Sequence, residues 1–166
     1  MADDMKIAAQ PGLPFELSKK LDLLKKKLKE KQTILIAFSG GTDSAFLTAV
    51  ATEVLGDLSL AVTIDSPLIP RKELNLAKAF AEQFNIRHKI VKLDLLQHQK
   101  ILANDPDRCY YCKVVILEKL LDIAESEGIT TVADGANSDD LDDYRPGNRA
   151  AIEKQIYRPL MDLKFT

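Results

Sequence analysis

The chain has 166 residues, of which 46% are hydrophobic and 29% charged, and its formal net charge is −2. This length and composition are ordinary for one globular domain with a hydrophobic core. The near balance of charge argues against an extended basic surface for nucleic acid or membranes, and no apolar run has the length of a membrane-spanning helix. We therefore expect a cytoplasmic protein with neither nucleic acid nor membrane as a partner.

The N-terminal region predicts a tail followed by an amphipathic helix. Residues 1–14 are mixed in character and end in Pro-Gly-Leu-Pro, which indicates a flexible tail before a domain at 15–166. Leucines then recur at intervals of four, three and four residues, while lysines fill the other faces. This helix is expected to pack on the sheet with its lysines in solvent. The leucines are Leu17, Leu21, Leu24 and Leu28.

A strand, a glycine-rich loop and a helix follow in direct succession. Six strand-forming residues, 33–38, run into SGGTDS at 39–44, and apolar residues at helical spacing continue to Leu55. The first turn of such a helix has backbone N–H groups without partners, and Gly40 and Gly41 allow a ligand to approach the backbone closely. The pattern therefore predicts an anion site. Hydroxyl groups come from Ser39, Thr42 and Ser44.

The loop sequence points to a particular class of ATP site. It lacks the lysine of the G-x-x-x-x-G-K-[ST] phosphate loop. SGGxDS instead resembles the PP-loop of the ATP pyrophosphatases, which cleave ATP between the α and β phosphates and leave AMP on a substrate. This resemblance implies bound ATP and Mg²⁺, catalytic roles for Ser39 and Asp43, and a Mg²⁺ ligand in Asp43. The alternative is an ordinary Gly-Gly turn with a serine cap.

The remaining chain alternates between strand and helix patterns. β-α-β-α-β order favours an α/β fold, with a parallel twisted sheet, helices on both faces and right-handed crossovers, of the Rossmann-like type found in adenine nucleotide alpha hydrolase-like PP-loop domains. The expected elements are strands 58–64, 88–94 and 130–136, helices 73–84 and 112–127, an aperiodic loop 95–108, a polar loop 137–149 and a short helix within 147–156.

The crevice at the carboxyl ends of these strands is the expected ligand site. For Mg²⁺, oxygen ligands from two strand ends are needed, which favours Asp43 with Asp140 and keeps Asp139 in reserve. The aspartates could instead keep a loop soluble, a role that Asp142 and Asp143 fit best. Adenine contacts are expected from Ala37, Phe38, Ile64, Asp65 and Ser66, and a further ATP contact from Gly135. Contacts to an anionic substrate or to pyrophosphate are expected from Arg108, Lys113, Arg145 and Arg149.

Two later segments carry a narrower resemblance. DGANSDD resembles the strand-end segment of NAD synthetase, where a carboxylate three positions after an asparagine holds the metal, as Asp140 follows Asn137 here. NDPDRCYYCK and DGANSDDLDDYRPGNRA, after SGGTDS, together resemble the ATP-dependent sacrificial sulfur transferases of the LarE type. This implies adenylation of a pyridinium biscarboxylate mononucleotide, its conversion to a thiocarboxylate for the nickel-pincer nucleotide, and a homo-oligomer. Such proteins continue past the segment at which this chain ends, so we expect it to be their N-terminal domain, with the C-terminal part missing.

The two cysteines, Cys109 and Cys112, are too few for a disulfide framework. They match the extra pair of the family branch in which three cysteines hold an iron-sulfur cluster, so the resemblance implies a [4Fe-4S] cluster with its third cysteine outside this chain. In the other branch the sulfur comes from a cysteine of the protein itself. A redox-active dithiol and two packed apolar side chains remain as alternatives for the pair.

Two rival functions stay open at this stage. One is another adenylating PP-loop enzyme, either an amide-forming synthetase or a tRNA-thiolating enzyme, although the latter should show a basic face. The other is a nucleotide-binding module without chemistry. The histidines, His88 and His98, have no ligand-like spacing and are expected to be structural or exposed.

Overall fold

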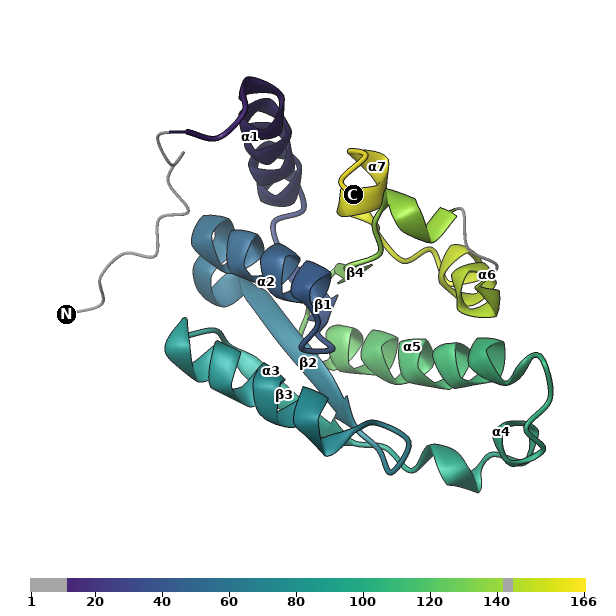
Figure 1. Ribbon diagram of the computed structural model, residues 1–166. Helices are drawn as coiled ribbons and strands as arrows, with labels where there is room; N and C mark the ends of the chain where they lie inside the picture. Colours follow the sequence, from purple (N-terminus) through teal and green to yellow (C-terminus); the bar gives the residue numbers. More distant parts are fainter. Residues whose placement is uncertain (1–11, 142–144) are drawn as a thin grey trace.

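The computed structural model of the protein describes residues 12–141 and 145–166. Within them, four parallel strands form a sheet in the order β3-β2-β1-β4, which confirms the predicted α/β fold (Figure 1). The tail predicted for 1–14 lies outside the described residues up to residue 11, as do Asp142 and Asp143. The strands are β1 (Ile34–Ala37), β2 (Ser59–Asp65), β3 (His88–Lys92) and β4 (Thr131–Asp134).

The two central strands are short aliphatic runs buried on both faces, as expected of a parallel sheet. In the register, Ala37 at the end of β1 is level with Val62 on β2 and with Asp134 on β4. The carboxyl ends of β1 and β4 therefore lie side by side. Since the crossover from β1 leads to β2 on one side and β4 lies on the other, the strand order reverses at this point, where α/β folds bind ligands.

Three helices cover one face of the sheet: α1 (Phe15–Glu30), α2 (Thr42–Leu55) and α3 (Arg71–Gln83). The leucine stripe predicted for α1 is confirmed, because Leu24 and Leu28 are fully buried against Ile34 and Val50. Leu17, the first leucine of that stripe, is 39% exposed. None of the described helices has the length and apolar character needed to cross a membrane.

The opposite face is covered by α5 (Arg108–Ser126) and α6 (Pro146–Glu153), and Figure 1 shows α5 across the sheet from α2. Leu117 and Leu120 on α5 are fully buried in the same cluster as Leu35 and Val62. The chain then returns to the sheet: Tyr157 N–H donates to Val132 O at 2.9 Å, and Asp134 N–H donates to Tyr157 O at 3.1 Å. Two short helical segments flank this region, η3 (Ser138–Leu141) and α7 (Pro159–Asp162).

The region predicted as an aperiodic loop, 95–108, differs from that expectation. It contains a 3₁₀ turn, η2 (Leu95–Gln97), and a short helix, α4 (Gln99–Leu102). Helix α5 begins at Arg108, four residues before the predicted start at 112, so both cysteines lie in its first two turns. Asp107 stands at the N-cap position, a favoured place for aspartate, but its side chain makes no capping hydrogen bond. A 3₁₀ turn at Gly56–Leu58 delays β2 by one residue.

Two glycines allow the backbone segments around the phosphate loop to approach closely. Gly40 has a φ angle of +83°, and a Cβ there would lie 2.6 Å from Glu73 O on α3. A Cβ on Gly135, just after β4, would lie 2.7 Å from Ser44 N and 2.8 Å from Ser44 Cα. Since real Cβ atoms do not approach backbone so closely, the end of β4 can touch the first turn of α2 only through a glycine.

Replacing Gly135 by alanine should therefore push β4 away from α2. We expect Gly135→Ala to lower the free energy of unfolding by about 1–3 kcal/mol, the usual cost of overpacking. Gly147→Ala is a matched control, since its Cβ would meet Lys113 at an ordinary 3.6 Å, and alanine within α6 should be neutral or stabilising by up to about 1 kcal/mol. Urea denaturation measures both, and equal effects of the two substitutions would contradict the close approach.

Candidate functional site

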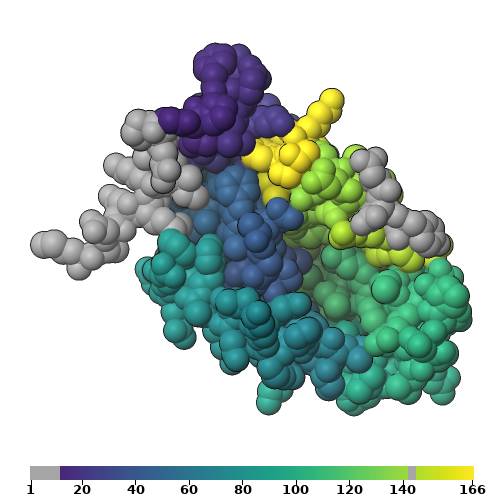
Figure 2. Space-filling model, viewed as in Figure 1, coloured from purple at the N-terminus to yellow at the C-terminus, as the bar shows by residue number. Residues whose placement is uncertain are grey.

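A cavity of about 650 Å³ lies where the carboxyl ends of β1, β2 and β4 meet α2 and α5. In Figure 2 the surface is hollowed between the blue atoms of α2 and the green atoms of α5. Of the ATP-binding residues predicted from the sequence, nine line this cavity. They are Ala37, Phe38, Ser39, Gly41, Thr42, Asp43, Ser44, Ile64 and Gly135.

The phosphate loop is held in shape by its own hydroxyl groups. Ser39 Oγ and Ser44 Oγ share a hydrogen bond of 3.1 Å, Gly41 N–H donates to Ser39 Oγ at 3.3 Å, and Ser44 Oγ donates to Gly41 O at 3.1 Å. The start of α2, with Gly41 as its N-cap, has no side-chain cap. Its first N–H groups and the positive end of the 14-residue helix dipole thus face the cavity, as an anion site requires.

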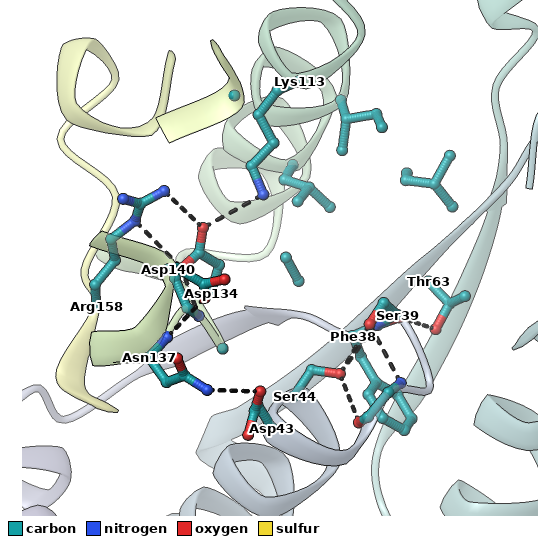
Figure 3. Close-up of a pocket in the computed structure, with 18 of the residues that line it drawn as sticks. Phe38, Ser39, Asp43, Ser44, Thr63, Lys113, Asp134, Asn137, Asp140 and Arg158 are labelled. Atoms are coloured by element: carbon teal, nitrogen blue, oxygen red, sulfur yellow. Dashed lines mark hydrogen bonds and ion pairs between the residues drawn. The ribbon is translucent and has the colours of Figure 1, made fainter. Parts of the chain in front are cut away.

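The two predicted Mg²⁺ ligands line the same cavity and are linked through Asn137. Asp43 on α2 and Asp140 after β4 both line the cavity, and Asn137 lies between them (Figure 3). Asn137 Nδ2 donates to Asp43 Oδ2 at 3.0 Å, and Asn137 N–H donates to Asp140 Oδ2 at 3.0 Å. Arg145, another predicted substrate contact, pairs with Asp140 Oδ1 at 2.6 Å. Asp139 also lines the cavity.

The oxygen donors of these two carboxylates suit a Mg²⁺ ion. A carboxylate oxygen has two lone pairs, so Asp43 and Asp140 keep acceptor capacity beside their present partners. Among residues 12–141 and 145–166, no group of three or more His, Cys, Asp or Glu side chains forms a metal cage. Mg²⁺ typically uses one or two carboxylates and completes its octahedron with phosphate oxygens and water, which matches this open arrangement.

The floor of the cavity holds a charged cluster that the sequence did not reveal. Asp134, the last residue of β4, is 5% exposed and pairs with Arg158, which is 8% exposed, at 3.4 Å. Lys113, a predicted substrate contact, lies 3.3 Å from the same carboxylate. Arg158 Nη2 also donates to Asn148 Oδ1 at 3.3 Å, and Asn148 Nδ2 donates to Asp140 O at 3.0 Å. The cluster therefore connects the segment after α6 to β4 and, through Asn148, to the backbone of Asp140.

The wall on the β2 side is apolar and suits a base. Val62, Ile64 and Ile69 line it, with Ile116 and Leu120 from α5. Three predicted nucleotide contacts lie outside the lining. Gly40 packs on α3, Asp65 pairs with Arg71 at 2.6 Å, and Ser66 is fully buried.

His88 supports this wall from behind, in line with its expected structural role. Thr63, which lines the cavity, donates its hydroxyl to Phe38 O at 2.7 Å, so Thr63 Oγ1 is left to accept from His88 Nε2, also at 2.7 Å. The imidazole further makes an edge contact with the Phe38 ring, at 5.6 Å between centroids. Burial, and secondarily the charge of Lys78, lower the pKa of His88, so the imidazole is neutral near pH 7.

The cysteines and two of the predicted cations lie outside the cavity lining. Arg108 donates to Asn104 Oδ1 at 3.1 Å, and the Arg149 guanidinium lies 3.9 Å from the centre of the Tyr110 ring. Cys109 and Cys112 are free thiols on α5, the first exposed and the second half-buried. Each lies one helical turn before a cavity-lining residue, Lys113 and Ile116 respectively. Within the described residues these two thiols belong to no group of three or more metal-ligating side chains.

Comparisons with known proteins bear on the family and the fold of the chain. A sequence model of the NAD synthase family matches residues 16–105, which include the phosphate loop. A glutamine-dependent NAD⁺ synthetase from Acinetobacter baumannii, solved with ADP, superposes with a TM-score of 0.66 over 82% of this chain and 28% of the synthetase. At 16% identity, this similarity shows the fold alone.

Two relatives are closer in sequence. The chain is 39% identical over 150 residues to an uncharacterized protein of Synechocystis, covering 90% of this chain and 56% of the relative. It is 38% identical over 139 residues to the pyridinium-3,5-bisthiocarboxylic acid mononucleotide synthase of Lactiplantibacillus plantarum, covering 83% of this chain and 50% of the relative. The chain spans about half the length of these curated relatives. The second match confirms the predicted resemblance to the PP-loop domain of LarE-type proteins.

The lowered pKa of His88 gives a prediction for stability against pH. The unfolded chain protonates this imidazole at its ordinary pKa of about 6.5, whereas the folded protein resists protonation, so stability should fall as the pH drops through 6.5. His88→Gln should flatten the dependence between pH 7 and 5, and the control His98→Gln should leave it unchanged. Thermal denaturation across this range measures both. Parallel curves for the wild type and His88→Gln would contradict the assignment.

The two thiols should also differ in reactivity. Burial raises the pKa of Cys112; the nearby Arg108 opposes this effect and Cys109 adds to it. We expect iodoacetamide to label the exposed Cys109 faster than Cys112 at pH 7, and Cys112 labelling to rise only above the ordinary thiol pKa of about 8.5. Mass spectrometry of the single variants Cys109→Ser and Cys112→Ser measures each rate. Equal rates at pH 7 would show that Cys112 is not protected.

Proposed function

Because the chain belongs to the NAD synthase family, we propose that its cavity binds ATP with Mg²⁺ and that the domain transfers AMP to a substrate carboxylate, releasing pyrophosphate. One observation carries this proposal. Asp43 in the first turn of α2 and Asp140 after β4 line one cavity at the uncapped start of α2, and Asn137 contacts both. A phosphate cradle beside two carboxylates suits a nucleotide triphosphate bound as its Mg²⁺ complex.

Different parts of the cavity bind the phosphates, the adenine and the Mg²⁺ of the nucleotide. The N–H groups at the start of α2 bind the β and γ phosphates, and the hydroxyls of Ser39 and Ser44 keep the loop in the shape that presents them. The apolar wall, which includes Ile64, holds the adenine. Asp43 and Asp140 would hold the Mg²⁺, which neutralises phosphate charge and so improves pyrophosphate as a leaving group.

Adenylation then needs a carboxylate placed in line with the α phosphorus. One carboxylate oxygen forms a bond to that phosphorus, the bond to the α–β bridging oxygen breaks, and its electron pair leaves with pyrophosphate. Lys113 and Arg145 line the cavity and are the cations that would orient this anionic substrate. Arg108 on α5 and Arg149 on α6 lie outside the cavity lining, so they would contact only a part of the substrate that extends from the cavity.

The substrate proposal is narrower and comes from the relatives. The match to the L. plantarum synthase supports a pyridinium biscarboxylate mononucleotide as the carboxylate that is adenylated and then receives sulfur, in nickel-pincer nucleotide synthesis. Cys109 and Cys112, one turn from the cavity, would contribute two ligands to a [4Fe-4S] cluster whose third cysteine lies outside this chain. By the same resemblance the protein would be a homo-oligomer that acts on a small molecule. Its composition and near-neutral charge favour a cytoplasmic protein without nucleic acid as a partner.

An amide-forming reaction is the second candidate, because the family model that matches is that of NAD synthase. In such a reaction ammonia, and not a sulfur donor, would attack the adenylated carboxylate. Both candidates share the first step, so pyrophosphate release tests them together. The product formed with ammonia or with a sulfur source separates them.

Pyrophosphate release is the direct test. With ATP, Mg²⁺ and pyridinium-3,5-biscarboxylic acid mononucleotide, we expect release that falls at least about 100-fold in Asp43→Asn, because the phosphate charge is then poorly neutralised. Mg²⁺-dependent ATP binding should be lost as well, with the melting temperature unchanged. Asp22→Asn, at an exposed aspartate on α1, is the matched control and should retain full activity.

Two results would contradict the proposal. Unchanged Mg²⁺-dependent ATP affinity in Asp43→Asn would remove Asp43 from the metal site. ATP binding by the wild type without pyrophosphate release, with the mononucleotide or with other carboxylates, would leave only a nucleotide-binding module.

A further inference from the structure

Asn137 links the two carboxylates that the proposed function assigns to Mg²⁺, and the inference rests on that assignment. Its side-chain amide contacts Asp43 on α2, and its backbone N–H contacts Asp140 after β4, each at 3.0 Å. Figure 3 shows Asn137 between the two acidic residues. One residue thus sets the relative position of two groups that come from distant parts of the chain.

The orientation of the Asn137 amide is determined by the hydrogen bonds around it. Asn137 Oδ1 accepts from Asp139 N–H at 2.9 Å, which closes a local turn. With the oxygen engaged by a backbone donor, the NH₂ group is the end that faces Asp43, where an acceptor is required. The same side chain therefore stabilises the loop after β4 and reaches across to α2.

The two carboxylates have the same charge and face one site, so they repel each other when no cation lies between them. Asn137 offers one N–H to each carboxylate and carries no charge of its own. It offsets the repulsion while leaving lone pairs on both carboxylates for a metal. Arg145 already pairs with Asp140 Oδ1 at 2.6 Å, so a second cation in place of Asn137 would take further lone pairs that Mg²⁺ needs.

A second asparagine holds the same loop by a different route. Asn148 Nδ2 donates to the backbone oxygen of Asp140 at 3.0 Å, and Arg158 in turn contacts Asn148. Asn148 therefore holds the main chain of Asp140 and does not contact its carboxylate. Removing the Asn137 side chain therefore leaves the loop anchored, while its contact with Asp43 is lost.

We propose that Asn137 is a positioning residue that holds Asp43 and Asp140 at the spacing Mg²⁺ requires. It acts through the two carboxylates and is not itself a metal ligand. Residues that orient metal ligands typically change metal affinity 10–100-fold when they are replaced. The expected consequence is a loss of metal affinity at Asn137 variants, with ATP affinity in the absence of metal preserved.

Mn²⁺ binding, followed by electron paramagnetic resonance in the presence of α,β-methylene ATP, tests the proposal without catalysis. Asn137→Ala should raise the dissociation constant for Mn²⁺ about 10-fold or more. Asn137→Ser is the decisive variant, because its hydroxyl can still accept from Asp139 N–H and keep the turn, but is too short to reach Asp43. It should weaken Mn²⁺ binding as Asn137→Ala does. Asn75→Ala, at an exposed asparagine on α3, should bind as the wild type does.

The outcomes separate this inference from the proposed function. If Asn137→Ser binds Mn²⁺ as tightly as the wild type, Asn137 serves only the turn and the inference is wrong, whether or not Asn137→Ala folds. If Asp43→Asn abolishes Mn²⁺ binding while both Asn137 variants retain it, the proposed metal site stands and only the positioning role fails. If Asp43→Asn also retains Mn²⁺ binding, the metal site itself is wrong.

Discussion

The contact between the end of β4 and the first turn of α2 is the constraint on which the site depends. It exists because β4 lies next to β1 in the sheet and because Gly135 has no side chain to keep Ser44 away. Only at this separation can Asn137, two residues further on, reach Asp43 on α2. A phosphate-binding helix start and an acidic loop thus form one cavity, although 94 residues separate Asp43 from Asn137 along the chain.

Charge in the cavity is arranged in two layers. The floor is a buried ion pair between Asp134 and Arg158, joined by Lys113, and its role is to hold the returning chain against β4. Breaking such a pair is costly, because it leaves a buried charge without a partner. Above the floor, Asp43 and Asp140 face the cavity and keep free lone pairs. The floor therefore fixes the geometry, and the upper layer is left to bind ligands.

Local sequence patterns predicted most of the helices and strands. The leucine stripe predicted α1, and the strand, loop and helix around 33–55 predicted the phosphate loop and the cavity it lines. Asp43 and Asp140 could be paired in advance, since parallel strands end at one edge of the sheet. Arg158 could not be found in this way, because it lies in an irregular segment whose return to β4 is a long-range event. The early start of α5 was missed although Asp107, a residue type favoured at N-caps, precedes it, because the apolar spacing used to predict the helix begins only at Val115.

The central claim is that this cavity binds the Mg²⁺ complex of ATP with its phosphates at the start of α2. A crystal structure with α,β-methylene ATP and Mn²⁺, using the anomalous signal of manganese, tests it most directly. The account predicts phosphates against the N–H groups of Gly41 to Ser44, and a manganese peak roughly 2.0–2.3 Å from carboxylate oxygens of Asp43 and Asp140. Phosphates bound elsewhere, or manganese away from both carboxylates, would contradict it.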